Sequence, residues 1–148
     1  MPKLILLSAC EKVIVDRSQL PSMINIFQRM TFEVTDAPLP EKAVAPTRWD
    51  ILTIWQHTPE EKGVDFVQHT TVVSPDKSIF VETTTKFKVT DDNDLQSKNV
   101  SQIMGVPVSK EGSVIVKVSL EGLPESAAEI RFLISHLRKD QGPAAGPN

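Results

Sequence analysis

The stretch Arg48-Trp49-Asp50-Ile51-Leu52-Thr53-Ile54-Trp55-Gln56-His57 carries both tryptophans of the chain. Trp49, Ile51 and Trp55 occupy positions of one parity, and alternate residues of a β-strand point to the same face of a sheet. The spacing therefore predicts a central strand whose aromatic face lies in the core of a β-sandwich.

The length and charge of the chain limit the classes to which it can belong. A chain of 148 residues fits one domain, which at this size buries about 68–70% of the surface of the unfolded chain. The formal net charge is −3 and lysine and arginine do not cluster in one stretch, which argues against a nucleic-acid partner. No apolar run approaches the length of a transmembrane segment. The single cysteine, Cys10, cannot form an internal disulfide and suits a cytoplasmic location.

The N-terminal segment resembles a lipoprotein signal only in part. Leu7-Ser8-Ala9-Cys10 matches the small-residue pattern that precedes a lipidated cysteine in bacteria. However, only Leu4 to Leu7 are strongly apolar, whereas a secretory signal needs an apolar region of about 7–15 residues. We therefore interpret this segment as a buried first strand, with Cys10 as a small core residue.

Alternating side chains and turn residues predict a single antiparallel β-sandwich of about eight strands, formed by residues 1–139. Residues 140–148 are rich in glycine, proline and alanine and are expected to be a disordered tail. Two N-terminal pieces, Leu4–Ala9 and Val13–Val15, are one bent strand or a strand and its continuation. The later strands are expected at Met23–Val34, Arg48–His57, Val64–Val73, Ile79–Val89, Val100–Val108 and Ser113–Leu120.

Three consecutive segments, Arg48–His57, Val64–Val73 and Ile79–Val89, are expected to form a meander. Ser74-Pro75-Asp76-Lys77 has the signature of a type I turn, with proline at its second position. Pairing its first residue with its last places Val72 opposite Ile79 and Phe66 opposite Thr85. Pairing His57 with Val64 across the preceding loop places Trp55 opposite Phe66.

This register separates apolar from polar side chains, because residues on one strand alternate between the two faces. The expected inner face collects Trp49, Ile51, Trp55, Phe66, Val72, Ile79, Val81 and Phe87. On the outer face, Asp65 is expected beside Lys86 and His69 beside Glu82. Such pairs contribute about 0.2–1 kcal/mol each, enough to favour a register.

The segment Ser126–Lys139 fits two structures. As a helix it has a capping box formed by Ser126 and Glu129 and an apolar stripe. As a strand it alternates and buries Phe132, and it covers the edge that Ser113–Leu120 would otherwise leave open. We favour the strand, with a C-terminal helix as the alternative.

No catalytic or metal-binding motif stands out. His57, His69 and His136 are scattered singly, without a second ligand at metal-binding spacing. Cys10 lies in an apolar strand, where a thiol is usually inert. These observations predict a protein that is not an enzyme and that has no cofactor and no metal site.

Two features remain as candidate binding sites. Leu52, Ile54, Val67 and Phe80 are expected to form an apolar cluster on the outer face of the meander, and such clusters often mark partner surfaces. We therefore expect a binding or assembly module, with an unknown protein partner or by self-association. The alternative is a calcium-dependent membrane- or ligand-binding domain like the C2 domains, which would use the acidic run Asp91, Asp92, Asn93 and Asp94.

Several stretches together resemble a family of small bacterial proteins of unknown function. They are Leu4–Glu11, Val13–Asp16, Ser22–Phe27, Asn99 with Gly105-Val106-Pro107, Glu111-Gly112 and Leu120-Glu121-Gly122. The resemblance extends from Met1 to about Lys139. It implies a cytosolic β-sandwich and supports a last strand at Ile130–Leu137, but it implies no known activity.

Overall fold

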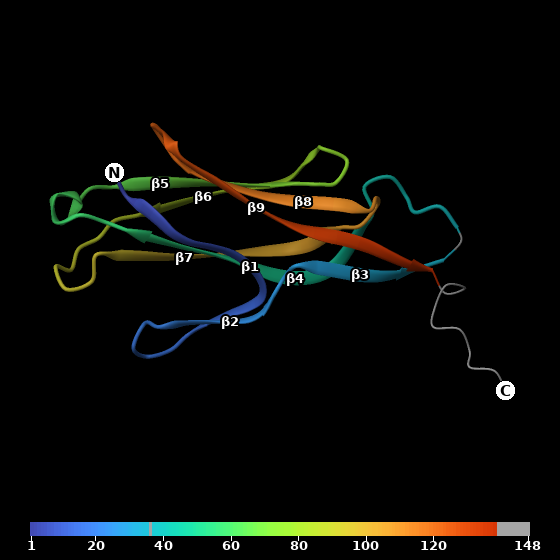
Figure 1. Cartoon of the computed structure of the whole chain (residues 1–148), viewed down its shortest axis with the longest axis horizontal. Helices are drawn as coiled ribbons and strands as arrows, with labels where there is room; N and C mark the ends of the chain where they lie inside the picture. The colour runs from blue at the N-terminus through green and yellow to red at the C-terminus, as the bar shows by residue number, and fades with distance from the viewer. Residues whose placement is uncertain (36, 139–148) are drawn as a thin grey trace.

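The computed structural model describes residues 1–35 and 37–138. In this part, the chain forms nine β-strands and one turn of 3-10 helix, η1 (Pro59–Glu61) (Figure 1). The strands are β1 (Lys3–Val15), β2 (Pro21–Ile26), β3 (Arg29–Val34), β4 (Val44–Gln56), β5 (Phe66–Val73), β6 (Ile79–Phe87), β7 (Gln96–Pro107), β8 (Gly112–Leu120) and β9 (Leu123–Arg138).

The strands form two sheets that enclose a common core. One sheet has four strands in the order β2-β1-β4-β7, and the other has five in the order β3-β9-β8-β5-β6. Strands β3 and β9 run parallel, from the pair Arg29 and Leu133 onward, and the other paired strands are antiparallel. The predicted all-β sandwich is confirmed, but it has nine strands and one parallel pair. Parallel neighbours need a long crossover, and here strands β4 to β8 supply it.

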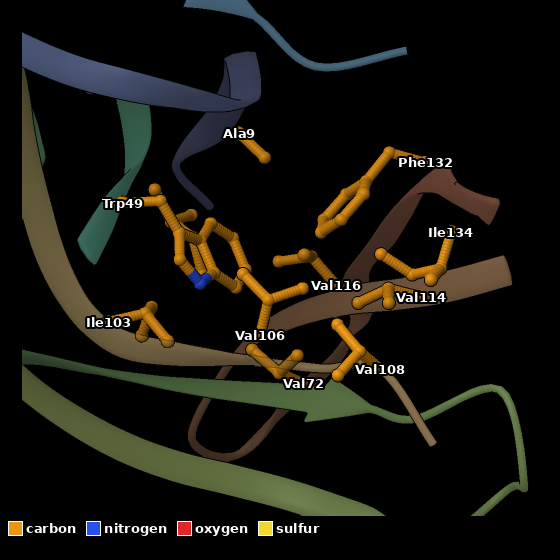
Figure 2. Packing of buried hydrophobic residues seen from close by; sticks show 11 residues of the cluster. Ala9, Trp49, Val72, Ile103, Val106, Val108, Val114, Val116, Phe132 and Ile134 are labelled. Atoms are coloured by element: carbon orange, nitrogen blue, oxygen red, sulfur yellow. The ribbon is translucent and has the colours of Figure 1, made fainter. Parts of the chain in front are cut away.

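The aromatic face of β4 lies in the core, as predicted. Trp49, Ile51 and Trp55 are each at most 1% exposed. Trp49 packs edge-to-face against Phe132 of β9, with ring centroids 5.4 Å apart. Figure 2 shows side chains of both sheets converging on the space between these two rings. This contact joins the two sheets at the centre of the apolar core.

The Trp55 half of the core contains a buried polar network centred on Gln68, which is 1% exposed. Its Oε1 accepts hydrogen bonds from Trp55 Nε1 at 2.7 Å, Thr53 Oγ1 at 2.8 Å and Asn99 Nδ2 at 3.3 Å. Its Nε2 donates to Thr70 Oγ1 at 2.9 Å. Since the indole N–H can only donate, the amide oxygen must face Trp55. The network therefore joins the two sheets with specific geometry.

The predicted meander is wrong at its first connection. Strand β4 lies between β1 and β7, whereas β5 lies between β8 and β6 in the other sheet. The loop that contains η1 carries the chain from one sheet to the other. A polar loop of this kind can close a hairpin or cross between layers, and the alternation within β4 is the same in both cases.

The β5–β6 hairpin is confirmed, but its register is shifted by two residues. Val72 pairs with Val81 and Phe66 with Phe87. The turn is longer than predicted, because Ser74 N donates to Ser78 O at 2.8 Å and Lys77 adopts a left-handed φ of 73°. Three-residue hairpin loops commonly combine a type I turn with a left-handed residue. From Val81 onward, a shift of two residues keeps each side chain on its predicted face. Ile79, which was predicted on the inner face, pairs with Val73 and is 60% exposed.

The same shift changes the polar neighbours on the outer face. Asp65 lies 3.7 Å from Lys88 instead of beside Lys86. His69 pairs with Thr84 instead of Glu82, and its Nε2 lies 3.8 Å from a carboxylate oxygen of Glu121.

The predicted strand Met23–Val34 is wrong, because the structure has β2 and β3 there in different sheets. The chain crosses between them at Phe27, whose N donates to Ala9 O at 2.9 Å. The ring of Phe27 packs against Trp49 and Phe132, with centroids 6.1 Å and 5.5 Å apart. Burial of this ring fixes the crossing point.

The C-terminal segment is a strand, which confirms the favoured structure over the helix. Strand β9 pairs with β8 on one side and β3 on the other, and Phe132 is 1% exposed. The predicted tail, residues 140–148, lies outside the described part of the chain.

Candidate interaction surface

The four residues of the predicted apolar cluster lie on two different sheets. Leu52 and Ile54 are in β4, whereas Val67 is in β5 and Phe80 is in β6. Leu52 is fully buried, and the other three are partly buried. The structure therefore does not bring the four together on one face, because β4 and β5 do not pair.

Phe80 faces the core because β6 contains a bulge. The pairing shifts between Val72 and Val73, which leaves Phe80 as an extra residue on β6. Bulges re-aim side chains in this way. A Cβ at Gly105 would lie 3.5 Å from the ring of Phe80 and 2.5 Å from Val44 Cγ1. Gly105, at φ +91°, therefore allows β7 to lie close to the Val44 side chain beside this ring.

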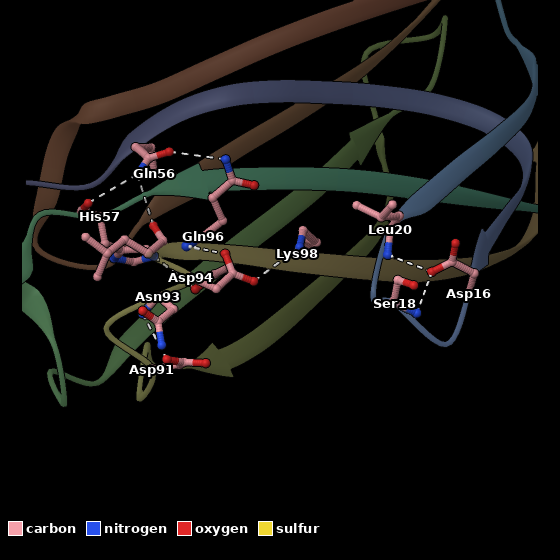
Figure 3. Close-up of polar contacts among 12 residues, drawn as sticks. Asp16, Ser18, Leu20, Gln56, His57, Asp91, Asn93, Asp94, Gln96 and Lys98 are labelled. Atoms are coloured by element: carbon pink, nitrogen blue, oxygen red, sulfur yellow. Dashed lines mark hydrogen bonds and ion pairs between the residues drawn. The ribbon is translucent and has the colours of Figure 1, made fainter.

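The hairpin of residues 11–26, formed by the second half of β1 and by β2, is the feature that the sequence did not reveal. Figure 1 shows its loop extending away from the main body of the sandwich. Its tip is held by Asp16, whose Oδ1 accepts from the backbone N–H groups of Ser18 at 2.8 Å and Leu20 at 3.0 Å (Figure 3). Asp16 O also accepts from Gln19 N at 3.0 Å. The tip is thus an ordered turn that leaves Leu20 60% exposed.

The hairpin presents large apolar side chains to solvent. No residue of this described segment belongs to either apolar core cluster. Val13 and Met23 are a pair on one face and are partly buried, whereas Ile14 and Ile24 lie on the other face. The exposed apolar residues of the hairpin are Ile14 (44%), Val15 (45%), Leu20 (60%), Ile24 (40%) and Ile26 (58%).

Strand β2 differs from the other edge strands in charge. Its sequence, Pro-Ser-Met-Ile-Asn-Ile, contains no charged residue. The three other edges each contain charged residues, which proteins use to prevent edge-to-edge pairing. These residues are Arg29 and Glu33 in β3, Glu82 and Lys86 in β6, and Lys98 in β7.

The base of the hairpin is fixed to β4. Val13 N donates to Oδ2 of the buried Asp50 at 2.8 Å. Cys10 pairs with Asp50 and is fully buried, as predicted. Burial raises the pKa of the Cys10 thiol, and the Asp50 carboxylate raises it further. Lys12 and Arg48 line a cleft of about 380 Å³ at this base. The hairpin is therefore anchored at its base and exposed toward its tip.

His57 and Ser97 form the arrangement that most resembles catalytic chemistry. His57 Nε2 lies 2.9 Å from Ser97 Oγ, and its Nδ1 lies 3.6 Å from Glu61 Oε2 without a hydrogen bond. Burial lowers the pKa of His57, and Glu61 partly opposes this shift. His57 is 3% exposed and Ser97 is 7% exposed. The imidazole and the hydroxyl are therefore both withdrawn from solvent.

The other two histidines lie apart from this pair. His69 is on β5 beside Thr84, and His136 Nε2 lies 2.7 Å from Val108 O. Within residues 1–35 and 37–138, no three His, Cys, Asp or Glu side chains are grouped so that they could hold a metal ion.

The acidic run Asp91–Asp94 is an exposed turn whose carboxylates already have partners (Figure 3). Asp91 Oδ1 accepts from Asn93 N at 2.9 Å. Asp92 is paired with Lys62 at 2.8 Å and Asp94 with Lys98 at 3.4 Å. The carboxylates point to these partners and not to one shared point.

In the described part of the chain, no helix is long and apolar enough to cross a membrane. No protein-family model matches the sequence, and no curated protein matches it. The resemblance to a family of small bacterial proteins of unknown function therefore stays a prediction.

Proposed function

We propose that this protein is a non-enzymatic binding or assembly module that contacts protein through its β1–β2 hairpin. The observation that carries the proposal is the set of exposed apolar side chains on an ordered, anchored hairpin. This surface replaces the cluster predicted at Leu52, Ile54, Val67 and Phe80, whose members lie on different sheets.

These exposed side chains do not contribute the stabilisation that burial in the core would give them. Burying a valine, leucine or isoleucine side chain stabilises a protein by about 1.5–3 kcal/mol relative to leaving it exposed. The hairpin forgoes this gain at five positions, whereas Ile103 and Ile134 of the sandwich are 2% exposed. Several exposed apolar side chains gathered on one short hairpin often mark an interaction surface.

We infer a cytoplasmic location from the single buried cysteine, since a reducing compartment does not require disulfides. The net charge of −3 supports a partner other than nucleic acid. For calcium binding, the contacts of Asp91–Asp94 offer no supporting observation, because calcium needs six to eight converging oxygens.

A pull-down from the native cell with the full chain tests the proposal. We expect a bound protein, either a different chain or another copy, to be lost when Ile24→Lys and Ile26→Lys are combined. Ile79→Lys is the matched control, since Ile79 is 60% exposed on a different edge strand. Equal capture by the hairpin variant and the control variant would overturn the role of the hairpin.

A further inference from the structure

We propose that the partner of the hairpin is a second copy of this chain, which pairs its β2 edge with the β2 edge of the first. This inference rests on the hairpin being the contact surface. The two strands would run antiparallel about a two-fold axis, the commonest symmetry of protein dimers.

The backbone of β2 is open on one side. Strand β1 pairs with the other side, from Cys10 and Ile26 to Val15 and Pro21, and β2 ends the sheet within the described chain. An open edge offers unpaired N–H and C=O groups to another strand. Pairing of two β2 strands would join the two four-stranded sheets into one continuous sheet.

The absence of charge makes β2 complementary to itself. In an isologous contact each residue meets the same surface on the partner, so a charged side chain near the axis would face its own copy. The segment Pro21–Ile26 has no charged residue, so an antiparallel pair has no like charges opposite one another. Each of the other three edges contains at least one charged residue.

The apolar side chains also match across the axis. Ile24 pairs with Lys12 and Ile26 with Cys10 of β1, and Asn25 between them has a left-handed φ of 53° that interrupts the regular alternation of the strand. An antiparallel pairing centred on Ile24 would bring Ile24 of the two copies opposite one another. β-branched cross-strand neighbours are a favourable combination in sheets. The contact would therefore bury exposed isoleucines of both hairpins next to one another at the axis.

Light scattering of the purified full chain over a range of concentrations measures the pairing. We expect the mass to approach twice the 16.4 kDa of one chain as concentration rises. The variant with both Ile24→Lys and Ile26→Lys should stay at the mass of one chain, and a circular dichroism spectrum equal to that of the unmodified protein would show that it is folded.

Cysteine cross-linking gives a second measurement that depends on position. Cysteines in two chains can bridge only when their Cα atoms lie within about 4.4–6.8 Å, and the native Cys10 is fully buried. We expect Ile24→Cys, alone or mixed with Ile26→Cys, to cross-link at least ten-fold faster than the control Ile79→Cys. A mass of one chain at every concentration, or equal cross-linking rates, would overturn self-pairing.

The two proposals fail in different ways. If the purified protein has the mass of one chain at every concentration, self-pairing is wrong. The proposed binding function then stands if the hairpin variant fails to capture a cellular protein that the unmodified chain captures. If the purified chain forms pairs that survive the hairpin substitutions, and the cellular partner is also retained, both proposals fail.

Discussion

The sandwich core and the β1–β2 hairpin use the same apolar residue types in opposite ways. In the core, Ile51 and Ile134 are at most 2% exposed and pack against rings and side chains of both sheets. In the hairpin, Ile24 is 40% exposed and Ile26 is 58% exposed, although both lie in a paired strand. Under the proposed function, the exposed side chains of the hairpin take part in association, and those of the core stabilise the fold.

The largest loss of stability is expected from a substitution in the apolar core. Trp49→Ala removes the ring that contacts Phe132 and Phe27 and leaves a cavity between the sheets. We expect the free energy of unfolding to fall by about 3–5 kcal/mol, as for other aromatic-to-alanine changes in cores. Urea unfolding measures this change. A loss below about 1 kcal/mol would contradict the central position of Trp49.

A smaller loss of stability is expected from a substitution in the polar network around Gln68. Gln68→Leu keeps the approximate volume but leaves Trp55 Nε1 and Thr53 Oγ1 without their acceptor. A buried polar group without a partner costs about 1–3 kcal/mol, so we expect a loss of that order. Thr53→Val, which removes a single donor of the network, is the control. If Gln68→Leu equals or exceeds the unmodified protein in stability, the network is not stabilising.

A third prediction concerns the pH dependence of the free energy of unfolding, to which the buried His57 contributes. Burial lowers its pKa in the folded state below the ordinary value of 6.5. As pH falls through 6.5, the unfolded chain therefore binds a proton at this site that the folded chain does not bind, and the free energy of unfolding falls. The loss continues until pH reaches the folded-state pKa.

Comparing the pH dependence of the unmodified protein with that of His57→Gln isolates this contribution. We expect the variant to have a weaker pH dependence of stability just below pH 6.5. An identical dependence in both proteins would show that His57 titrates alike in the folded and unfolded states.

The sequence predicts which side chains of a strand are buried better than it predicts which strands pair. The parity of Trp49 and Trp55 identified the core face, because this alternation depends on one strand alone. The partners of β4 depend on where the chain crosses between layers. The parallel pairing of Arg29 with Leu133 joins residues far apart in the chain. No local pattern encodes either of these choices.

The candidate surface was missed for a related reason. The position of Phe80 follows from a bulge, and the shared face expected for Leu52 and Val67 required β4 and β5 to pair. One signal in the sequence could have indicated the hairpin. Val13 and Ile14 are apolar at adjacent positions, so a two-stranded hairpin there has apolar residues on both faces but can bury only one of them against the sandwich.

The most direct test of the account is the effect of Ile26→Lys on the free energy of unfolding, measured by urea in a solution dilute enough to keep the chain unassociated. Ile26 is 58% exposed and belongs to no core cluster. If its role is in association, the change should stay within about 0.5 kcal/mol, as for ordinary surface substitutions. A loss of about 2 kcal/mol or more would show that the isoleucine stabilises the fold itself, and would contradict the division of roles between the core and the hairpin.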